Sequence, residues 1–167
     1  MVGFTIDEIC KQAKVSRGLI NHHFDGKRDL LLAIYTEMTE HLADRSSELT
    51  AEAELASVIG VNFDTESFNR SNLRAWLSIW GQVPNDPQLS ALHRERYQGY
   101  RRRIEGALTV LVERDRLEID VASVARQLIA LIDGLWLEYC LHSESFSLEA
   151  ASEDCYRLLR SYGIEIN

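Results

Sequence analysis

Apolar residues recur three or four positions apart along almost the whole chain, which is the spacing of one face of an α-helix. No segment shows a sustained alternation of apolar and polar residues, and no Asn-Gly or Asp-Gly pair joins two β-branched runs, so strands are not expected. With 167 residues, 46% of them hydrophobic, the chain can bury a core. The pattern predicts an all-α protein.

Capping and breaking residues divide this pattern into separate helices. Residues that favour helix N-caps stand before the apolar segments at Thr5 (with Glu8 as a capping box), Ser16, Asp25, Asp120 and Ser147. Both prolines fall in one short loop at residues 84–87, which separates two helices. The expected helices cover residues 5–12, 17–22, 26–46, 48–62, 66–81, 88–114, 121–142 and 148–162.

Charge is distributed unevenly along the chain. The net charge is −8, which by itself argues against a nucleic-acid partner. Residues 1–30, however, hold five Lys and Arg against four acids, whereas residues 31–167 hold 13 against 22. A near-neutral N-terminal part on an acidic body suits a small DNA-reading unit joined to a larger part with another role.

Residues 5–32 have the dimensions of a helix-turn-helix, in which two short helices are joined by a three-residue turn. Its small apolar core is expected from Ile6, Ile9, Val15, Ile20 and Phe24. The second helix of such a unit can enter the major groove of DNA. The alternative is a helical hairpin with a solvated polar face.

The second helix of this unit carries side chains suited to base edges. Its outward-facing residues are expected to be Arg17, Gly18, Leu19, Asn21 and His22. Arg17 and Asn21 can form bidentate hydrogen bonds with guanine and adenine, and Leu19 can touch a thymine methyl. Lys27, in the first turn of the next helix, is unfavourable for the helix dipole but well placed to reach a phosphate.

This segment resembles the DNA-binding domain of the TetR family of transcriptional regulators. The pattern that carries the resemblance is Val15-Ser16, Gly18, Ile20, His23-Phe24, Lys27 and Leu30-Leu31. Residues 16–33, SRGLINHHFDGKRDLLLA, are most similar to the BetI-like subgroup, the choline-responsive repressors of the betaine pathway. The resemblance adds His23 to the expected DNA-binding residues. It departs at Asn21, where family members typically carry Tyr.

The resemblance extends into the C-terminal part. Trp76-Leu77 with Trp80, and residues 131–137, are similar to the same subgroup. It implies a helix-turn-helix domain at residues 1–46 and a ligand-binding and dimerisation domain at residues 47–167. The implied function is repression at a double-stranded DNA operator, relieved when a small-molecule effector binds the homodimer.

One family element has no counterpart here. Family members place a further helix before the segment that begins at Thr5, where this sequence has only Met1–Phe4. We expect either a start further upstream or a protein that lacks its first helix. In the second case, the alternative function is a truncated helical dimer that no longer binds DNA and acts through protein contacts.

The last two expected helices are candidates for dimerisation. Residues 121–142 are apolar on nearly all sides, which predicts a helix buried between layers, and Gly134 in its middle permits close helix approach. The last helix adds an apolar stripe of Leu148, Ala151, Cys155, Leu158, Leu159 and Tyr162. The family resemblance implies that both helices pair with their copies in a four-helix bundle that buries Gly134, Leu158 and Leu159. The alternative is a self-contained monomer core.

Aromatic residues and one carboxylate are the candidate effector site. They are Phe63, Trp76, Trp80, Tyr97, Tyr100, Asp133 and Trp136. A carboxylate inside an apolar helix is costly unless it is paired, so Asp133 either faces a cationic ligand or bonds a Trp or Tyr of its own chain. Aromatic faces with a carboxylate suit a choline-like organic cation. The alternatives are a hydrophobic effector and aromatics that are plain core.

Other functional classes find little support in the sequence. It contains no glycine-rich phosphate loop, GxSxG or HExxH motif, so we expect no enzyme, no cofactor and no metal site. No apolar run reaches the roughly 18 residues that a membrane span needs, and no signal-peptide pattern opens the chain. Three cysteines without a CxxC spacing suit reduced thiols, so a cytoplasmic location away from membranes is expected.

Overall fold

The computed structural model describes residues 6–43, 50–64, 69–142, 144 and 146–166. All regular structure in these ranges is helical, which confirms the all-α prediction. The elements are α1 (Ile6–Ala13), α2 (Arg17–His23), α3 (Lys27–Ala43), α4 (Ala51–Asn62), α5 (Arg70–Trp80), the short 3-10 helix η1 (Val83–Asn85), α6 (Pro87–Asp115), α7 (Val121–Leu141) and α8 (Leu148–Ser161).

Three expectations concern residues outside these ranges. The Thr5 capping box and the question of a missing first helix both rest on residues 1–5. The expected domain boundary between residues 46 and 47 lies within residues 44–49. The division into two domains at that point therefore stays a prediction.

Side-chain caps begin the helices where the sequence predicts them in three cases. The side-chain oxygens of Ser16, Asp120 and Ser147 each accept a backbone N–H three residues ahead, all at 3.1 Å. These local bonds satisfy N–H groups that have no partner inside the helix, so they fix helix starts independently of distant packing.

The expectation that Asp25 caps the third helix is wrong. The first helical hydrogen bond of α3 runs from the Leu30 N–H to the Gly26 carbonyl at 3.1 Å, so Gly26 stands at the cap. Its φ of +152° is a conformation that glycine adopts most readily. The Asp29 carboxylate instead reaches back and accepts the Asp25 N–H at 3.2 Å.

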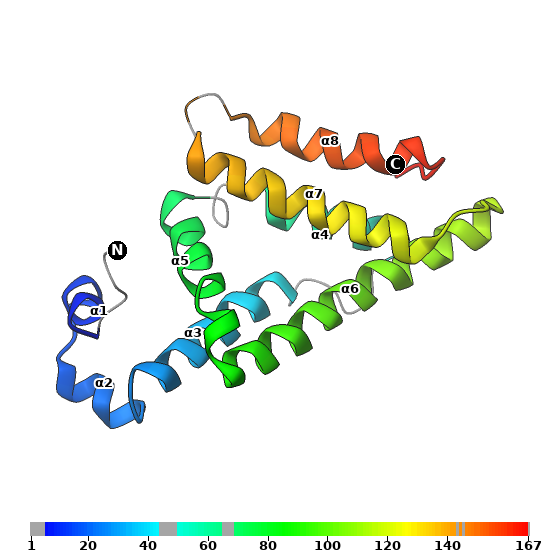
Figure 1. Cartoon of the computed structure of the whole chain (residues 1–167). Helices are drawn as coiled ribbons and strands as arrows, with labels where there is room; N and C mark the ends of the chain where they lie inside the picture. Colours follow the sequence, from blue (N-terminus) through cyan, green and yellow to red (C-terminus); the bar gives the residue numbers. More distant parts are fainter. Residues whose placement is uncertain (1–5, 44–49, 65–68, 143, 145, 167) are drawn as a thin grey trace.

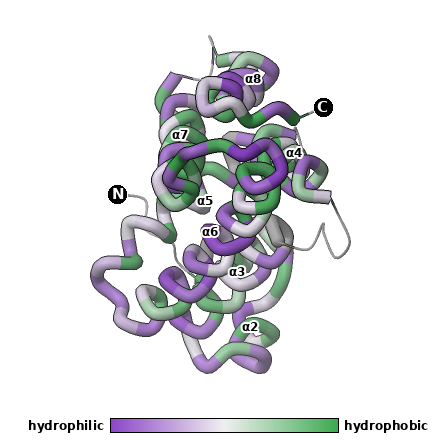
Figure 2. Tube along the Cα trace, turned by 90° about the vertical axis from the view of Figure 1, so that its right-hand side faces the viewer, coloured by the Kyte–Doolittle hydropathy of each residue, from purple (hydrophilic) through white to green (hydrophobic). Residues whose placement is uncertain are grey.

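The long helix α6 is the shared wall of the molecule. It packs against α3, α4 and α7, and α8 in turn packs on α7 and α4. α1 and α2 project beyond the start of α3 (Figure 1), and a view turned by 90° shows α2 and α8 at opposite ends (Figure 2). The fully buried core is built from Leu55, Ile59, Leu73, Ile79, Leu89, Ile104, Leu108, Leu111, Leu128, Ile129, Leu159 and Ile164.

The start of α6 is tied to the start of α3. The Asp86 carboxylate accepts the N–H groups of Gln88 and Leu89 at 2.9 and 3.1 Å and so caps α6. The same carboxylate accepts a hydrogen bond from Arg28 Nε at 3.0 Å. The Leu89 N–H, with the bonds from Gln88 and Arg28, holds the pKa of Asp86 below its usual range. One carboxylate therefore caps one helix and holds a second beside it.

The apolar stripe of α8 is divided between the chain's own core and the surface, since Leu148, Leu158 and Tyr162 are only partly buried. Ala151, Cys155 and Leu159 are buried in the chain's own core, because α8 packs that face onto α7 and α4. The exposed large apolar side chains near the C-terminal end of α7 are Leu137, at 45% exposure, and Leu141, at 65%.

No helix in the described part of the chain has the length and apolar character that crossing a membrane requires.

Candidate functional site

The N-terminal helices form a compact unit with one buried anchor. The turn between α1 and α2 is closed by a hydrogen bond from the Val15 N–H to the Cys10 carbonyl at 3.0 Å, with Lys14 in the left-handed region at φ 55°. In α2 only Ile20 is buried. Every other residue of that helix is exposed, as is Lys27 at the start of α3.

All seven residues predicted to bind DNA therefore lie on exposed positions of α2 and of the first turn of α3. Leu19, at 47% exposure, is an apolar side chain that the fold leaves in water. Arg17 Nη1 lies 3.0 Å from Asp7 Oδ1 of α1, in an ion pair whose side chains are 62% and 74% exposed. Such a surface pair contributes roughly 0–1 kcal/mol, so the guanidinium can leave Asp7 for a stronger partner.

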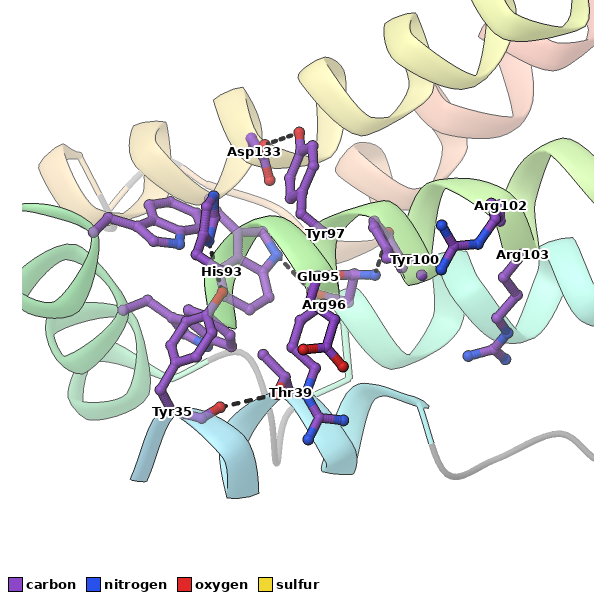
Figure 3. Close-up of a pocket in the computed structure, with 15 residues that line it drawn as sticks. Tyr35, Thr39, His93, Glu95, Arg96, Tyr97, Tyr100, Arg102, Arg103 and Asp133 are labelled. Carbon is purple, nitrogen blue, oxygen red and sulfur yellow. Dashed lines mark hydrogen bonds between the residues drawn. The ribbon is translucent and has the colours of Figure 1, made fainter. Parts of the chain in front are cut away.

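A cavity of about 320 Å³ lies among α3, α4, α5, α6 and α7 (Figure 3). Six of the seven residues predicted to bind an effector line it, namely Trp76, Trp80, Tyr97, Tyr100, Asp133 and Trp136. Phe63 does not line it, because that ring, 7% exposed, belongs to the hydrophobic core. Helices far apart in sequence thus bring most of the predicted residues to one place.

Trp76 is the centre of the aromatic wall. Its ring centroid lies 5.7 Å from that of Tyr35 and 5.9 Å from that of Trp136, in edge-to-face arrangements. Trp80 lies 5.7 Å away at a tilt of 48°. Trp136 Nε1 donates to the Asn62 carbonyl at 3.0 Å, which fixes the indole orientation. These contacts make the wall rigid before anything enters the cavity.

Asp133 is the carboxylate of this wall. The Tyr97 hydroxyl donates to Asp133 Oδ2 at 3.3 Å. Burial raises the pKa of Asp133 to about 6, and the bond from Tyr97 offsets part of that rise. Burial likewise raises the pKa of Tyr97 to about 12, so the phenol keeps its proton. No ion pair with Lys, Arg or His engages Asp133 within the described residues.

Both parts of the chain match known protein families. The model of the tetR family of bacterial regulatory proteins matches residues 1–34, and that of the BetI-type transcriptional repressor C-terminal domain matches residues 51–163. The chain belongs to the TetR family. It is a DNA-binding transcriptional regulator and not an enzyme, as the sequence predicted.

Curated TetR-family relatives span the same two parts. The HTH-type transcriptional regulator BetI of Cronobacter sakazakii is 32% identical over 154 residues, which cover 88% of this chain and 74% of the relative. The corresponding BetI regulator of Serratia proteamaculans is 31% identical over 150 residues, 86% of this chain and 74% of the relative.

Solved structures of transcriptional regulators share the fold. A transcriptional regulator of Pseudomonas aeruginosa is 31% identical with a TM-score of 0.75, covering 93% of this chain and 78% of that one. A regulator of Saccharomonospora viridis, solved in complex with choline, has a TM-score of 0.79 at 20% identity, covering 93% and 84%. At that identity the second likeness shows the fold alone.

Two cavity residues that the sequence analysis missed connect it to the DNA-binding end. The Tyr35 hydroxyl of α3 and His93 Nδ1 of α6 share a hydrogen bond of 2.7 Å. Burial raises the pKa of Tyr35 to about 12 and lowers that of His93. His93 stands one turn before Tyr97 on the same helix face, so helical spacing could have found it. Tyr35 could have been found from its place four residues after the buried Leu31.

The raised pKa of Asp133 predicts a pH-dependent stability. Ionisation of Asp133 does not affect the free energy of unfolding below about pH 4. It lowers that free energy progressively as the pH rises to about 6, because the pKa in the folded state exceeds that in the unfolded state. In Asp133→Asn, the free energy of unfolding relative to the native chain should rise by about 2–3 kcal/mol between pH 4 and 7. Urea unfolding at fixed protein concentration measures this difference, with Glu118→Gln as a control for loss of one exposed negative charge. A difference that stays flat with pH would contradict the shift.

Proposed function

We propose that this TetR-family regulator is a homodimeric repressor that leaves its DNA operator when a small organic cation enters the cavity. The observation that carries the proposal is Asp133, a carboxylate without an ion-pair partner in the described part of the chain, set into an aromatic-lined cavity. Because a bacterial regulator that acts on DNA works in the cytoplasm, we also propose a cytoplasmic location.

The cavity wall has the chemistry that holds a quaternary ammonium group. Aromatic faces attract such a cation by roughly 0.5–2 kcal/mol each, and a buried carboxylate adds charge complementarity. Trp76, Trp80, Trp136 and Tyr97 provide the faces, and Asp133 provides the charge. The choline bound by the regulator of Saccharomonospora viridis supports the same class of ligand.

The cavity is in direct contact with the helix that carries the DNA-binding unit. α3 contributes Tyr35 to the wall through its bond with His93, and two ion pairs flank that bond along the α3–α6 contact. These are Arg28 with Asp86 at 3.0 Å and Arg96 with Glu40 at 2.9 Å. A ligand that moves His93 therefore shifts α3, and α3 begins at the DNA-binding residues. The two conformations required of a repressor would differ in this contact.

The exposed face of α7 is the proposed dimer surface. Ala130, Gly134, Leu137 and Leu141 recur three or four residues apart, and all four are exposed. A Cβ built at Gly134 meets no atom within 4 Å, so the small residue serves no close approach inside the chain. Close packing at Gly134 would then come from the same face of a second copy, as a two-fold interface requires.

The DNA-binding role predicts that substitutions of two basic residues weaken DNA binding in different ways. Arg17→Ala should weaken operator binding by about 1–3 kcal/mol and relax base preference at one position in each half-site. Lys27→Ala should weaken binding to all DNA sequences. It should also reduce the slope of log K against the logarithm of the salt concentration by about one. Mobility-shift titrations on the DNA flanking its gene, at several salt concentrations, measure both. Sequence-independent losses for both would contradict base reading by Arg17, and no binding by the native chain would favour the truncated, protein-binding alternative.

The dimer surface is tested by charge. Leu137→Glu and Leu141→Glu each place like charges against one another at a two-fold interface and should give monomers in light scattering. Val110→Glu, at another exposed apolar position (56%) on α6, should leave the dimer intact. A dimeric Leu137→Glu, Leu141→Glu double variant would exclude this face. Leu159 is unsuitable for the test, because it lies in the chain's own core.

The cationic effector is tested by fluorescence. All three tryptophans of the chain line the cavity, so choline binding should change the intrinsic emission and release DNA in the same concentration range. Asp133→Asn should weaken choline binding roughly tenfold, and in the native chain the affinity should fall below about pH 6 as the carboxyl takes up its proton. The matched ligand is the uncharged analogue with a tert-butyl group in place of trimethylammonium. Equal binding of that analogue would indicate a hydrophobic effector instead.

A further inference from the structure

The cavity is longer than a trimethylammonium group requires. His93, Arg96, Tyr97, Tyr100 and Arg103 of α6 all line it, at the spacing of one continuous helix face. With a rise of about 1.5 Å per residue, this face extends about 15 Å. The volume of about 320 Å³ is at the small end of the range for drug-sized ligands, which have several times the atoms of such a headgroup.

Opposite charges lie at separate positions along this length. Asp133 joins the wall beside Tyr97, whereas Arg102 and Arg103 line the end away from His93 and Tyr35 (Figure 3). The helical rise places Tyr97 and Arg102 about 7–8 Å apart along the axis. The cavity therefore has a negative region among aromatic rings and a positive region one to two helical turns further on.

The guanidinium groups that line the cavity are not all neutralised. Arg103 pairs with Glu54, and Arg96 pairs with Glu40 at 2.9 Å. Arg96 Nε is nevertheless buried without a hydrogen-bond partner. Arg102 is an exposed residue at the edge of the cavity, and within the described residues no ion pair or hydrogen bond engages it.

Glu95 is a further acid on the cavity wall, and it is exposed. Glu40 and Glu54 already pair with Arg96 and Arg103, and no ion pair joins Glu95 to Arg102 within the described residues. An anionic group of a ligand in the cavity would give Arg102 the charged partner that the chain does not supply.

We infer that the effector is a zwitterion, with a quaternary ammonium group held at Asp133 and an anionic phosphate or carboxylate held at Arg102. This inference rests on the proposed function, since it concerns the ligand of the same cavity. A two- or three-carbon linker between the charges matches the separation of the two regions, because the flexible Arg102 side chain covers the remaining distance.

The test compares three ligands with the same cationic head, by isothermal titration calorimetry on the native protein. Phosphocholine carries the anion, choline lacks it, and acetylcholine supplies length without negative charge. Phosphocholine should bind at least about tenfold more tightly than choline, and acetylcholine should not share the gain. Arg102→Ala should reduce the ratio of the phosphocholine to the choline affinity towards one. Arg94→Ala, at an exposed arginine of α6 that does not line the cavity, should keep the native ratio.

The outcomes separate this inference from the proposed function. Phosphocholine binding no tighter than choline, or a ratio unchanged in Arg102→Ala with native circular dichroism, would overturn the zwitterion and leave a cationic effector in place. Equal gains for acetylcholine and phosphocholine would show that length rather than charge is recognised, and would also overturn it. Failure of all three ligands to bind would remove both the zwitterion and the organic cation.

Discussion

Burial of the inner face of α6 is the constraint on which the rest of the molecule depends. Ile104, Leu108 and Leu111 in its C-terminal half are fully buried, and α4 and α7 pack around them. Deleting side chains of this size from a core typically costs about 2–5 kcal/mol, so this half of the helix is fixed. The N-terminal half continues as a rigid rod into the region where packing is incomplete, and there the same helix face lines the cavity. The cavity is thus an extension of the core rather than a separate structure.

This arrangement explains why polar groups gather in the cavity. A buried carboxylate or guanidinium without a charged partner lowers the stability of the fold. An apolar side chain at the same position would avoid this cost. Asp133 with its raised pKa and Arg96 with its unused N–H both retain such a cost. Uncompensated polar groups that sit together in a rigid cavity are typical of binding sites, where the ligand completes the interactions that the fold leaves open.

How much the sequence predicts depends on whether the responsible interaction is local. The caps at Ser16, Asp120 and Ser147 bond to residues three positions away, so they could be predicted from the sequence. Six cavity residues could be predicted because helical spacing places them on inward faces. The cavity arginines were missed, since their role depends on which helices meet, and Tyr35 was missed although helical spacing from Leu31 places it on the inward face of α3. The same limit explains the α8 stripe: periodicity shows that Leu159 is buried, but not whether its partner is α7 of the same chain or a second copy.

The contact between Arg28 and Asp86 has a consequence for how such a protein can drift in sequence. In an ordinary surface ion pair the acidic and the basic residue can exchange positions, because either arrangement gives the same attraction. Here the acid also accepts the N–H groups of Gln88 and Leu89, which a guanidinium, with no acceptor atom, cannot do. The basic partner at position 28 is therefore replaceable by lysine, while position 86 is restricted to the few short acceptor residues that cap helices. The acid and the base of this contact therefore cannot exchange positions. Among related sequences, position 28 should vary between arginine and lysine, whereas position 86 should keep a residue that caps helices.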